Sequence, residues 1–242
     1  MIKLILNGAN GKMGQTVASL VAEQENMEII FGADVDNPIE NAPVDADVIL
    51  DFSISSALPG VLGFALKNSI PLVLATTGYT EKQIEQIEKA SKVIPILRSA
   101  TMSIGANLLM KLSAITAEIL GDSFDVEILE KHHNQKLDSP SGVALALANS
   151  ISNVKADSKY IFERASANKK REKNEIGIAS IRGGSIIGEH TAIFAGPNEV
   201  IELTHKAQTR GIFAHGALKA VEFIVDKPAG IYDMQNVILT NK

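Results

Sequence analysis

The sequence predicts an α/β protein in which a doubly wound parallel sheet is joined to a second α+β domain with a mixed, largely antiparallel sheet. Three observations predict this class. Short apolar strands alternate with helical segments in the first part of the chain. A glycine-rich turn separates the first strand from the first helix. Further along, strands follow one another through short glycine turns. At 242 residues the chain is long enough for two modest domains, which we expect at 1–102 with 209–242 and at 103–208.

The first element is an apolar strand at Ile2–Leu6, followed by the turn Gly8-Ala-Asn-Gly-Lys-Met-Gly14 and an apolar-periodic stretch. Strand, glycine turn and helix form the context that a Rossmann dinucleotide-binding fingerprint requires. Gly8 would permit the tight turn, Gly11 would let the backbone approach a pyrophosphate, and Gly14 would let the helix pack closely on the strand. Such a turn alone is weak evidence for dinucleotide binding, so the prediction also depends on the elements that follow.

The second strand, Glu28–Ala33, ends at Asp34, about twenty residues beyond the last glycine of the turn. A carboxylate there would meet the hydroxyls of the adenosine ribose. Val35 follows it, and no arginine stands there to bind a 2′-phosphate. The sequence therefore favours NADH without excluding NADPH.

Two loops follow later strands of the predicted parallel sheet, and ligands of such sheets bind beyond the carboxyl ends of the strands. Ala75-Thr-Thr-Gly78 and Ser99-Ala-Thr-Met102 are small and polar enough to line a nicotinamide pocket, although ordinary loop chemistry would also explain them. Lys12 contacts a phosphate or is simply solvated. We expect the remaining strands and helices of this part at Val48–Phe52, Ser55–Lys67, Leu72–Ala75, Glu81–Ala90 and Val93–Leu97.

The second half begins with a long amphipathic helix, Ile104–Leu120. The polar patch Asn153–Asn174 is expected to be a solvated loop. The turns Gly183-Gly184 and Gly196-Pro-Asn-Glu are short enough for antiparallel hairpins, and the open face of that sheet would be covered by self-association into a homo-oligomer. We expect strands at Glu175–Arg182, Ser185–Phe194 and Val200–Ala207, a helix at Gly211–Val225, and a tail, Ile231–Leu239, that returns to the first domain.

The segment Glu130–Gly142 is the most informative part of the chain. A half-buried strand at Phe124–Leu129 precedes it and a helix at Val143–Ile151 follows it. Ser139 suits the N-cap and Pro140 the first helical position, so the N–H groups of Ser141, Gly142 and Val143 would be free to bind a carboxylate. Lys136, in the loop before this helix, would add a positive charge.

The adjacent His132 and His133 would then have an anionic ligand to act on, since histidine titrates nearest neutral pH. The alternative is that they are two surface or strand-end histidines with no catalytic or binding role. Neighbouring strand residues point to opposite faces, so the two imidazoles do not easily share one ion, and we expect no metal site.

Composition excludes several classes of function. A net charge of −5 gives no electrostatic signature of nucleic-acid binding. The absence of cysteine rules out disulfides and a thiol nucleophile, and fits a reducing compartment such as the cytoplasm. No export signal is visible and no apolar run reaches the length of a membrane span, so we expect neither a nucleic-acid nor a membrane partner.

Taken together, these motifs resemble the 4-hydroxy-tetrahydrodipicolinate reductase family, also called dihydrodipicolinate reductase, of bacterial and plant lysine synthesis. The resemblance runs through nearly the whole chain, and its central His-His…Lys…Pro-Ser-Gly element is highly specific. It rests on Gly8-Ala-Asn-Gly-Lys-Met-Gly14, Ala75-Thr-Thr-Gly78, Glu130-Lys-His-His-Asn-Gln-Lys136, Asp138-Ser-Pro-Ser-Gly142, Ile181-Arg-Gly-Gly184, Gly188-Glu-His190 and Thr204-His-Lys206.

The resemblance implies an NAD(P)H-dependent oxidoreductase of the lysine and diaminopimelate pathway that reduces a small cyclic dicarboxylate, as a homotetramer. It assigns proton transfer to His132 and Lys136, and substrate contacts to His133, Lys136, Ser141, Gly142 and Val143. The family usually has threonine where this chain has Val143, which keeps the backbone N–H but lacks the hydroxyl. It places the cofactor at Gly8, Ala9, Asn10, Gly11, Lys12, Met13, Asp34, Ala75, Thr76, Thr77, Ser99, Ala100, Thr101 and Met102.

Two alternatives stay open. A homoserine- or semialdehyde-type dehydrogenase would share the nucleotide domain, but it would have no use for the Lys136 and Pro-Ser-Gly carboxylate site. An NAD(H)-responsive regulator would need a DNA-reading or partner-docking element, and none is apparent in the sequence.

Overall fold

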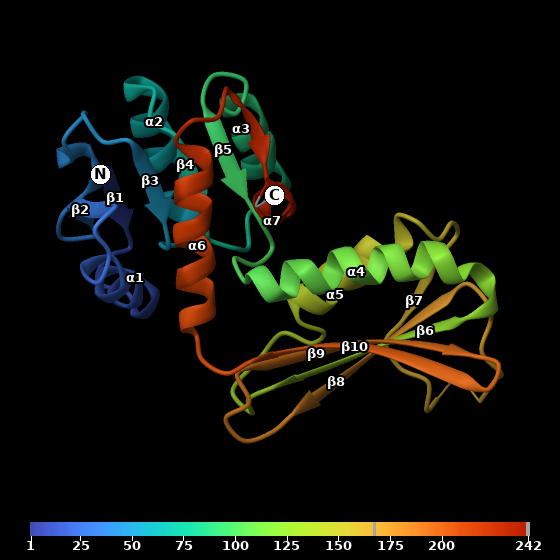
Figure 1. Ribbon diagram of the computed structural model, residues 1–242. Helices are drawn as coiled ribbons and strands as arrows, with labels where there is room; N and C mark the ends of the chain where they lie inside the picture. The colour runs from blue at the N-terminus through green and yellow to red at the C-terminus, as the bar shows by residue number, and fades with distance from the viewer. Residues whose placement is uncertain (167, 241–242) are drawn as a thin grey trace. The chain divides into compact units, whose positions relative to one another are not determined.

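A computed structural model describes residues 1–166 and 168–240, and it divides into two compact units (Figure 1). Unit 1 comprises Met1–Ile104 and Arg210–Lys242, and unit 2 comprises Gly105–Thr209. The chain therefore leaves unit 1, builds the whole of unit 2 and returns. The predicted fold class is confirmed, because unit 1 contains a parallel sheet with helices on both faces and unit 2 contains a mixed sheet.

The sheet of unit 1 has six strands in the order β11-β5-β4-β3-β1-β2, all parallel. Because β2 lies on one side of β1 and β3 on the other, the strand order reverses between β1 and β3, which is where ligands bind in such sheets. The C-terminal tail contributes the edge strand β11 to this sheet, where the sequence analysis predicted no strand. The strands are β1 (Ile2–Asn7), β2 (Met27–Ala33), β3 (Val48–Asp51), β4 (Leu72–Leu74), β5 (Pro95–Arg98) and β11 (Gly230–Tyr232).

Alternate residues of the strands in unit 1 supply two separate hydrophobic cores. On β1, Leu4 and Leu6 pack with α1 and α6, whereas Ile5 packs with α2 and α3. Side chains of a strand point alternately to its two faces, so a sheet covered on both sides needs this nearly continuous apolar composition. The helices are α1 (Lys12–Ala22), α2 (Leu58–Asn68), α3 (Glu81–Ala90), α6 (Gly211–Ile224) and α7 (Met234–Thr240), with 3₁₀ turns at Ile39–Asn41 and Ser55–Ala57.

Unit 2 is a five-stranded sheet in the order β10-β9-β6-β8-β7, with two helices on one face (Figure 1). Two pairings are antiparallel and two are parallel, so the sheet is mixed. Its core joins Val126 and Ile128 of β6 and Phe194 of β9 to both helices. The elements are α4 (Ile104–Leu120), a 3₁₀ turn at Gly121–Ser123, β6 (Asp125–His132), α5 (Gly142–Ser152), β7 (Lys159–Ile161), β8 (Glu175–Arg182), β9 (Gly188–Gly196) and β10 (Glu199–Ala207).

One of the two predicted hairpins is wrong. β9 and β10 pair antiparallel through the turn after Gly196, as expected. β8 and β9, in contrast, are not neighbours, because β6 lies between them and pairs with both. The Gly183-Gly184 segment therefore crosses the end of β6, and its Gly183 N–H donates to the carbonyl of His132 at 2.9 Å.

The polar patch Asn153–Asn174 is not simply the solvated loop that composition suggests. It contains the edge strand β7, and two of its arginines bind acidic residues of the sheet. Arg164 donates to Glu127 at 2.6 Å and to Glu175 at 2.5 Å, and Arg171 donates to Asp125 at 2.6 Å. These ion pairs hold the segment against the end of the sheet that carries the three carboxylates.

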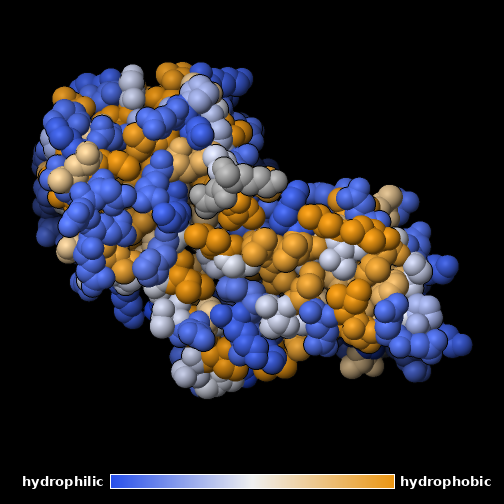
Figure 2. All heavy atoms as spheres, in the orientation of Figure 1, coloured by the Kyte–Doolittle hydropathy of each residue, from blue (hydrophilic) through white to orange (hydrophobic). Residues whose placement is uncertain are grey.

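The helix α4 is more apolar than the sequence analysis expected. Together with the turn that follows it, Ile104–Ser123 is long and apolar enough to cross a membrane by length and composition, a property that core helices of soluble proteins share. One side of α4 packs on the sheet through Leu109, Met110 and Ala117. Its other side exposes apolar side chains, which gather over α4 in Figure 2 and include Leu108, Leu112, Ile115 and Ile119.

Candidate functional site

The glycine turn after β1 is so closely packed that its backbone requires glycine at two positions. Gly8 adopts a φ of +81°, and a Cβ there would lie 2.7 Å from the carbonyl oxygen of Phe52, after β3. A Cβ on Gly14 would lie 2.2 Å from the carbonyl oxygen of Gly8, so only glycine lets α1 pack so closely on the turn. Gly11 is the N-cap of α1, makes no side-chain cap and is followed by no acidic residue in the first turn. The first N–H groups of α1 therefore remain available to an anion.

Asp34, at the end of β2, lies next to this turn. Its carboxylate accepts a hydrogen bond from the Asn10 N–H at 2.9 Å and another from the Val35 N–H at 2.8 Å. The Asn10 amide side chain also donates to Asp36 at 3.1 Å. These bonds hold the carboxylate beside the glycine turn, where a ribose hydroxyl can donate to it. The fit of a dinucleotide to unit 1 thus rests on the close-packed glycines, the uncapped helix and this carboxylate.

Asp51, a buried carboxylate at the carboxyl end of β3, was not among the residues predicted from the sequence. It accepts hydrogen bonds from Asn7 at 2.7 Å, from Ser53 at 2.5 Å and from Thr76 at 2.8 Å. These three donors follow or end β1, β3 and β4, so one carboxylate connects the carboxyl ends of three neighbouring strands. Its position at a strand end is a sequence signal that could have identified it.

The predicted loop residues of unit 1 differ in accessibility. Thr76 is buried in the Asp51 network, whereas Thr77 is exposed. In the loop after β5, Ala100 is exposed while Thr101 and Met102 are buried. Both loops lie at carboxyl ends of strands, as the sequence predicts, and their exposed members are the ones that a ligand can reach.

In unit 2, the strand β6 carries the candidate catalytic histidine on its buried face. Burial alternates along the strand, so Val126, Ile128, Glu130 and His132 share one side. His132 therefore continues the row of core residues beneath α5, at the end of the strand. His133 follows the last residue of β6 and is half-buried.

Glu130 is fully buried and collects hydrogen bonds from several donors. Its carboxylate lies 2.6 Å from Nδ1 of His132 and accepts two hydrogen bonds from Arg182, at 2.7 and 2.8 Å. The N–H of Ser141 donates to it at 3.2 Å. Burial raises the pKa of Glu130, but the hydrogen bonds from Arg182 and His132 outweigh it and bring the pKa to about 2. The carboxylate is therefore charged at neutral pH.

Burial lowers the pKa of His132, while the hydrogen bond and the charge of Glu130 raise it; the net effect is a lowered pKa. Lys136 and Arg182 add smaller lowering effects through their charges. In the free protein the imidazole is therefore largely neutral at neutral pH. A nearby anion would reverse this by favouring the imidazolium.

The N-terminus of α5 lies two residues later than predicted. Ser141, not Ser139, is the N-cap, and its hydroxyl accepts a hydrogen bond from the Ala144 N–H at 3.2 Å. The predicted first helical residue, Pro140, instead follows a cis peptide bond. The free N–H groups of the first turn are therefore those of Gly142 and Val143, because the Ser141 N–H is bonded to Glu130.

His190 of β9 supports this N-cap from the core. Its Nε2 lies 3.0 Å from the Ser141 hydroxyl, and its ring meets that of His132 edge-on, at 5.2 Å between centroids. Burial lowers the pKa of His190 to about 4, and the charge of His132 adds to the effect. A neutral His190 can accept the hydroxyl hydrogen of Ser141, which leaves the hydroxyl oxygen free to cap the helix.

Lys136 lies in the short loop between β6 and α5. Its N–H donates to the carbonyl of His133 at 3.2 Å, which closes a turn, and its ammonium group pairs with Asp138 at 2.8 Å. Arg182 donates to the carbonyl of Asp138 at 2.7 Å and so fixes the same loop. Unit 2 thus brings together His132, Lys136, Ser141, Gly142 and Val143, five of the predicted site residues.

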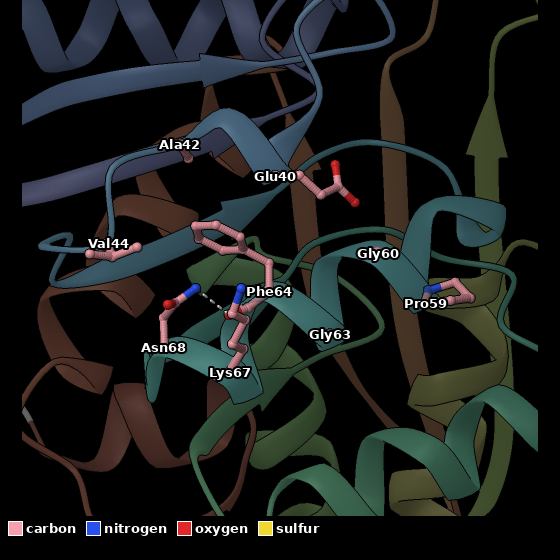
Figure 3. A pocket seen from close by; sticks show the side chains of 9 residues that line it. All are labelled: Glu40, Ala42, Val44, Pro59, Gly60, Gly63, Phe64, Lys67 and Asn68. Atoms are coloured by element: carbon pink, nitrogen blue, oxygen red, sulfur yellow. Dashed lines mark hydrogen bonds between the residues drawn. The ribbon is translucent and has the colours of Figure 1, made fainter.

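A cavity of about 370 Å³ lies elsewhere in unit 1 (Figure 3). The outer side of α2 forms one wall, and the segment that leads to β3 forms the other. None of the predicted site residues lines it. Its lining residues are Glu40, Ala42, Val44, Pro59, Gly60, Gly63, Phe64, Lys67 and Asn68.

Comparisons with known proteins cover the whole chain. Residues 2–102 match the family model described as dihydrodipicolinate reductase, N-terminus, and residues 105–238 match the model of the C-terminus. A 4-hydroxy-tetrahydrodipicolinate reductase of Clostridium perfringens is 46% identical over 254 residues and covers 100% of both chains. One of Caldanaerobacter subterraneus subsp. tengcongensis is 45% identical and covers 98% of both.

Solved structures agree with this result. A dipicolinate-bound dihydrodipicolinate reductase from Paenisporosarcina sp. TG-14 matches with a TM-score of 0.79, 27% identity and coverage of 98% of this chain and 99% of that one. A probable dehydrogenase from Thermotoga maritima, at 8% identity and a TM-score of 0.61, covers 98% of this chain and 93% of that one and shares the fold alone. With both family models matched in order and relatives of this identity along its full length, the chain belongs to the dihydrodipicolinate reductase family.

Proposed function

We propose which residues of this chain carry out the reduction for which its family is named, and how they do it. Its activity is that of a 4-hydroxy-tetrahydrodipicolinate reductase, an oxidoreductase in lysine and diaminopimelate biosynthesis. The enzymes of this family use NAD(P)H. Unit 1 is proposed as the dinucleotide-binding domain and unit 2 as the substrate-binding and oligomerisation domain.

The substrate is a cyclic dicarboxylate whose reduced bond is conjugated to a ring imine. A bound nicotinamide would supply the hydride to a ring carbon, and the ring nitrogen would then gain electron density. One proton must arrive to complete the reduction, directly or through water. We assign the proton to His132 and Lys136, two groups of unit 2 that can carry one.

Binding of the substrate would prepare His132 for this role. One carboxylate would meet the ammonium group of Lys136 and the N–H groups of Gly142 and Val143, with His133 as a further contact. This arrangement fixes the distance and the face of the ring for transfer. Two added negative charges would also raise the lowered pKa of His132, so the imidazole would take up a proton when the dicarboxylate binds.

For the coenzyme we propose the residues of the glycine turn and of the two strand-end loops, together with Asp34. Support comes from the close-packed glycines and from the carboxylate held beside Asn10. NADH is the favoured coenzyme, because Val35 follows Asp34 and offers no charge to a 2′-phosphate.

We also propose that the chain forms a homotetramer and works in the cytoplasm, as part of a soluble biosynthetic family. The face of the five-stranded sheet that α4 and α5 leave open exposes Ile181 and Val200. A second copy of the chain would bury this face. Analytical ultracentrifugation at micromolar concentration should give a tetramer, and a monomer would contradict this part of the proposal.

The observation that carries the proposal is the cluster of His132, Lys136 and the uncapped amides of α5 within one unit. The test is the oxidation of NADH and of NADPH, with and without the condensation product of pyruvate and aspartate semialdehyde. We expect oxidation only with this product, and faster oxidation of NADH. Dipicolinate, which is bound in the structure of the Paenisporosarcina relative, should inhibit by competing with substrate. Absence of product-dependent oxidation with either coenzyme would refute the assignment.

A further inference from the structure

We propose that Glu130 is a positioning residue for this reaction: its buried carboxylate holds Nδ1 of His132 and so directs Nε2 of that imidazole to the substrate. This inference rests on the proposed role of His132. Glu130 itself has no contact with substrate in this proposal and acts only through the groups that it holds.

Glu130 is surrounded by hydrogen-bond donors. Its side chain is fully buried, yet His132, Arg182 and the Ser141 N–H all lie within hydrogen-bond distance. Burying a carboxylate is costly unless donors surround it, and a structural ion pair with Arg182 would need neither of the other two. The carboxylate of Glu130 thus fixes both His132, the candidate proton carrier, and Ser141, the N-cap of the helix proposed to bind the substrate carboxylate.

The two ring nitrogens of His132 have different roles. Each nitrogen of a histidine makes one hydrogen bond, and the bond made by one sets the tautomer and the task of the other. Nδ1 of His132 lies 2.6 Å from Oε2 of Glu130, so the neutral ring carries its hydrogen on Nδ1. The lone pair then lies on Nε2, and Nε2 is the nitrogen that gains and gives the catalytic proton.

The opposite edge of the His132 ring lies next to Gly188 of β9. A Cβ at this position would lie 3.1 Å from Nε2 and 3.5 Å from Cδ2 of His132. Glycine therefore keeps a space the size of a methyl group beside Nε2. Gly188 is not among the residues with a positive φ, so its backbone does not require glycine, and the space at Nε2 gives a reason for the residue.

Charges around His132 make the proposal testable. Glu130, on the same strand, favours its protonated form, whereas Lys136 of the following loop and Arg182 of β8 disfavour it. His190 of β9 faces the ring edge-on, and Asp138 lies in the same loop as Lys136. Glu130 and Arg182 thus act on His132 with opposite signs, although they are partners in one ion pair.

The experiment compares Glu130→Gln with Arg182→Gln, using ¹⁵N NMR of the histidine side chains and the pH profile of kcat. In Glu130→Gln the pKa of His132 should fall, and its single tautomer should become a mixture, because an amide offers Nδ1 either an acceptor or a donor. Since the reaction needs protonated His132, the loss of kcat at high pH should move to lower pH. At neutral pH, kcat should fall about 10- to 100-fold, the range seen when groups that orient metal-binding histidines are removed.

In Arg182→Gln the pKa of His132 should rise, and the loss of kcat at high pH should move to higher pH. The reason is that a positive charge has been removed while Glu130 remains beside His132. A merely structural ion pair would lower activity in both variants without opposite shifts. Unchanged His132 NMR signals in Glu130→Gln, or shifts in the same direction in both variants, would overturn the inference. If opposite NMR shifts appear but the pH profiles of kcat stay in place, Glu130 positions His132 and it is the proposed proton transfer that fails.

Gly188→Ala provides a test that leaves Glu130 intact, should Glu130→Gln not fold. The added methyl group should lower kcat about tenfold or more, while the NMR signals keep the Nδ1-protonated tautomer. Full activity in this variant would contradict the assignment of Nε2. NADH binding to unit 1 should be the same in all three variants, which controls for damage to the coenzyme site.

Discussion

At the scale of single residues, two ion pairs of the proposed substrate site in unit 2 differ in exposure. Lys136 pairs with Asp138, whose side chain is 59% exposed, so water screens the pair and a dicarboxylate can replace Asp138 at little cost. The pair of Glu130 and Arg182 is different, because the Glu130 side chain is 0% exposed and its partner cannot leave cheaply. The exposed pair thus suits a group that must bind substrate, and the buried pair suits a group that must stay in place.

Replacing either proposed proton carrier should therefore affect catalysis rather than coenzyme binding. We expect His132→Ala and Lys136→Ala each to lower kcat by about 10²–10⁴-fold, the usual effect of removing a general acid or base. The dissociation constant of NADH, measured by fluorescence titration, should barely change, because neither residue belongs to unit 1. Near-parental turnover of both variants would show that other groups deliver the proton.

The sequence identified these residues more readily than their partners. His132, Lys136 and the helix start stand together in one short segment and have evident chemistry. Arg182 and His190 lie far along the chain, and only the pairing of β6 with β8 and β9 brings them to Glu130 and His132. Glu130 could have been found, because the alternation that buries Val126 and Ile128 extends to it.

At the scale of elements, patterns within one segment were reliable and choices between segments were not. The βα alternation gave the first five strands of unit 1, β1 to β5, to within a few residues, but not the edge strand β11. The false hairpin between β8 and β9 arose because a short glycine turn allows direct pairing but cannot reveal that β6 takes the place between them. The N-cap of α5 was misplaced because Ser139 and Ser141 are both good caps, and only the bond from Ala144 distinguishes them.

The packing of α1 on the glycine turn gives a prediction at this scale. Gly14→Ala should destabilise unit 1 by about 1–3 kcal/mol and weaken NADH binding, because its Cβ would overlap the backbone carbonyls of Gly8 and Ala9. Gly63→Ala in α2 is the matched control, since open space surrounds its Cβ and alanine favours a helix by about 0.5–1 kcal/mol. Thermal unfolding should show opposite shifts, and a neutral Gly14→Ala would disprove the close contact.

At the scale of the whole molecule, the buried histidines of unit 2 make stability depend on pH. The pKa of His190 is lowered by burial from 6.5 to about 4. An unfolded chain binds this proton at the ordinary pKa, so folding is favoured most above pH 6.5 and loses this contribution as pH falls toward 4. Burial also lowers the pKa values of His132 and His205, which adds to the same trend.

The free energy of unfolding, measured with denaturant, should therefore fall as pH falls across that window. His190 should account for about 3 kcal/mol of this loss at most. His190→Gln should be less stable at neutral pH but should show a flatter dependence on pH. His215→Gln, at an exposed position of α6, should leave the dependence unchanged. An equally steep loss of stability in His190→Gln would show that other groups are responsible.

The return of the chain to unit 1 also has a consequence for its synthesis. α6 supplies Ala217, Val221 and Ile224 to the core beneath the first sheet, and β11 forms an edge of that sheet. A ribosome that has translated only the N-terminal half has therefore made unit 1 without α6, although α1 already covers part of the same face of its sheet. Unit 1 therefore stays incomplete until α6 and β11 have been synthesised and have left the exit tunnel.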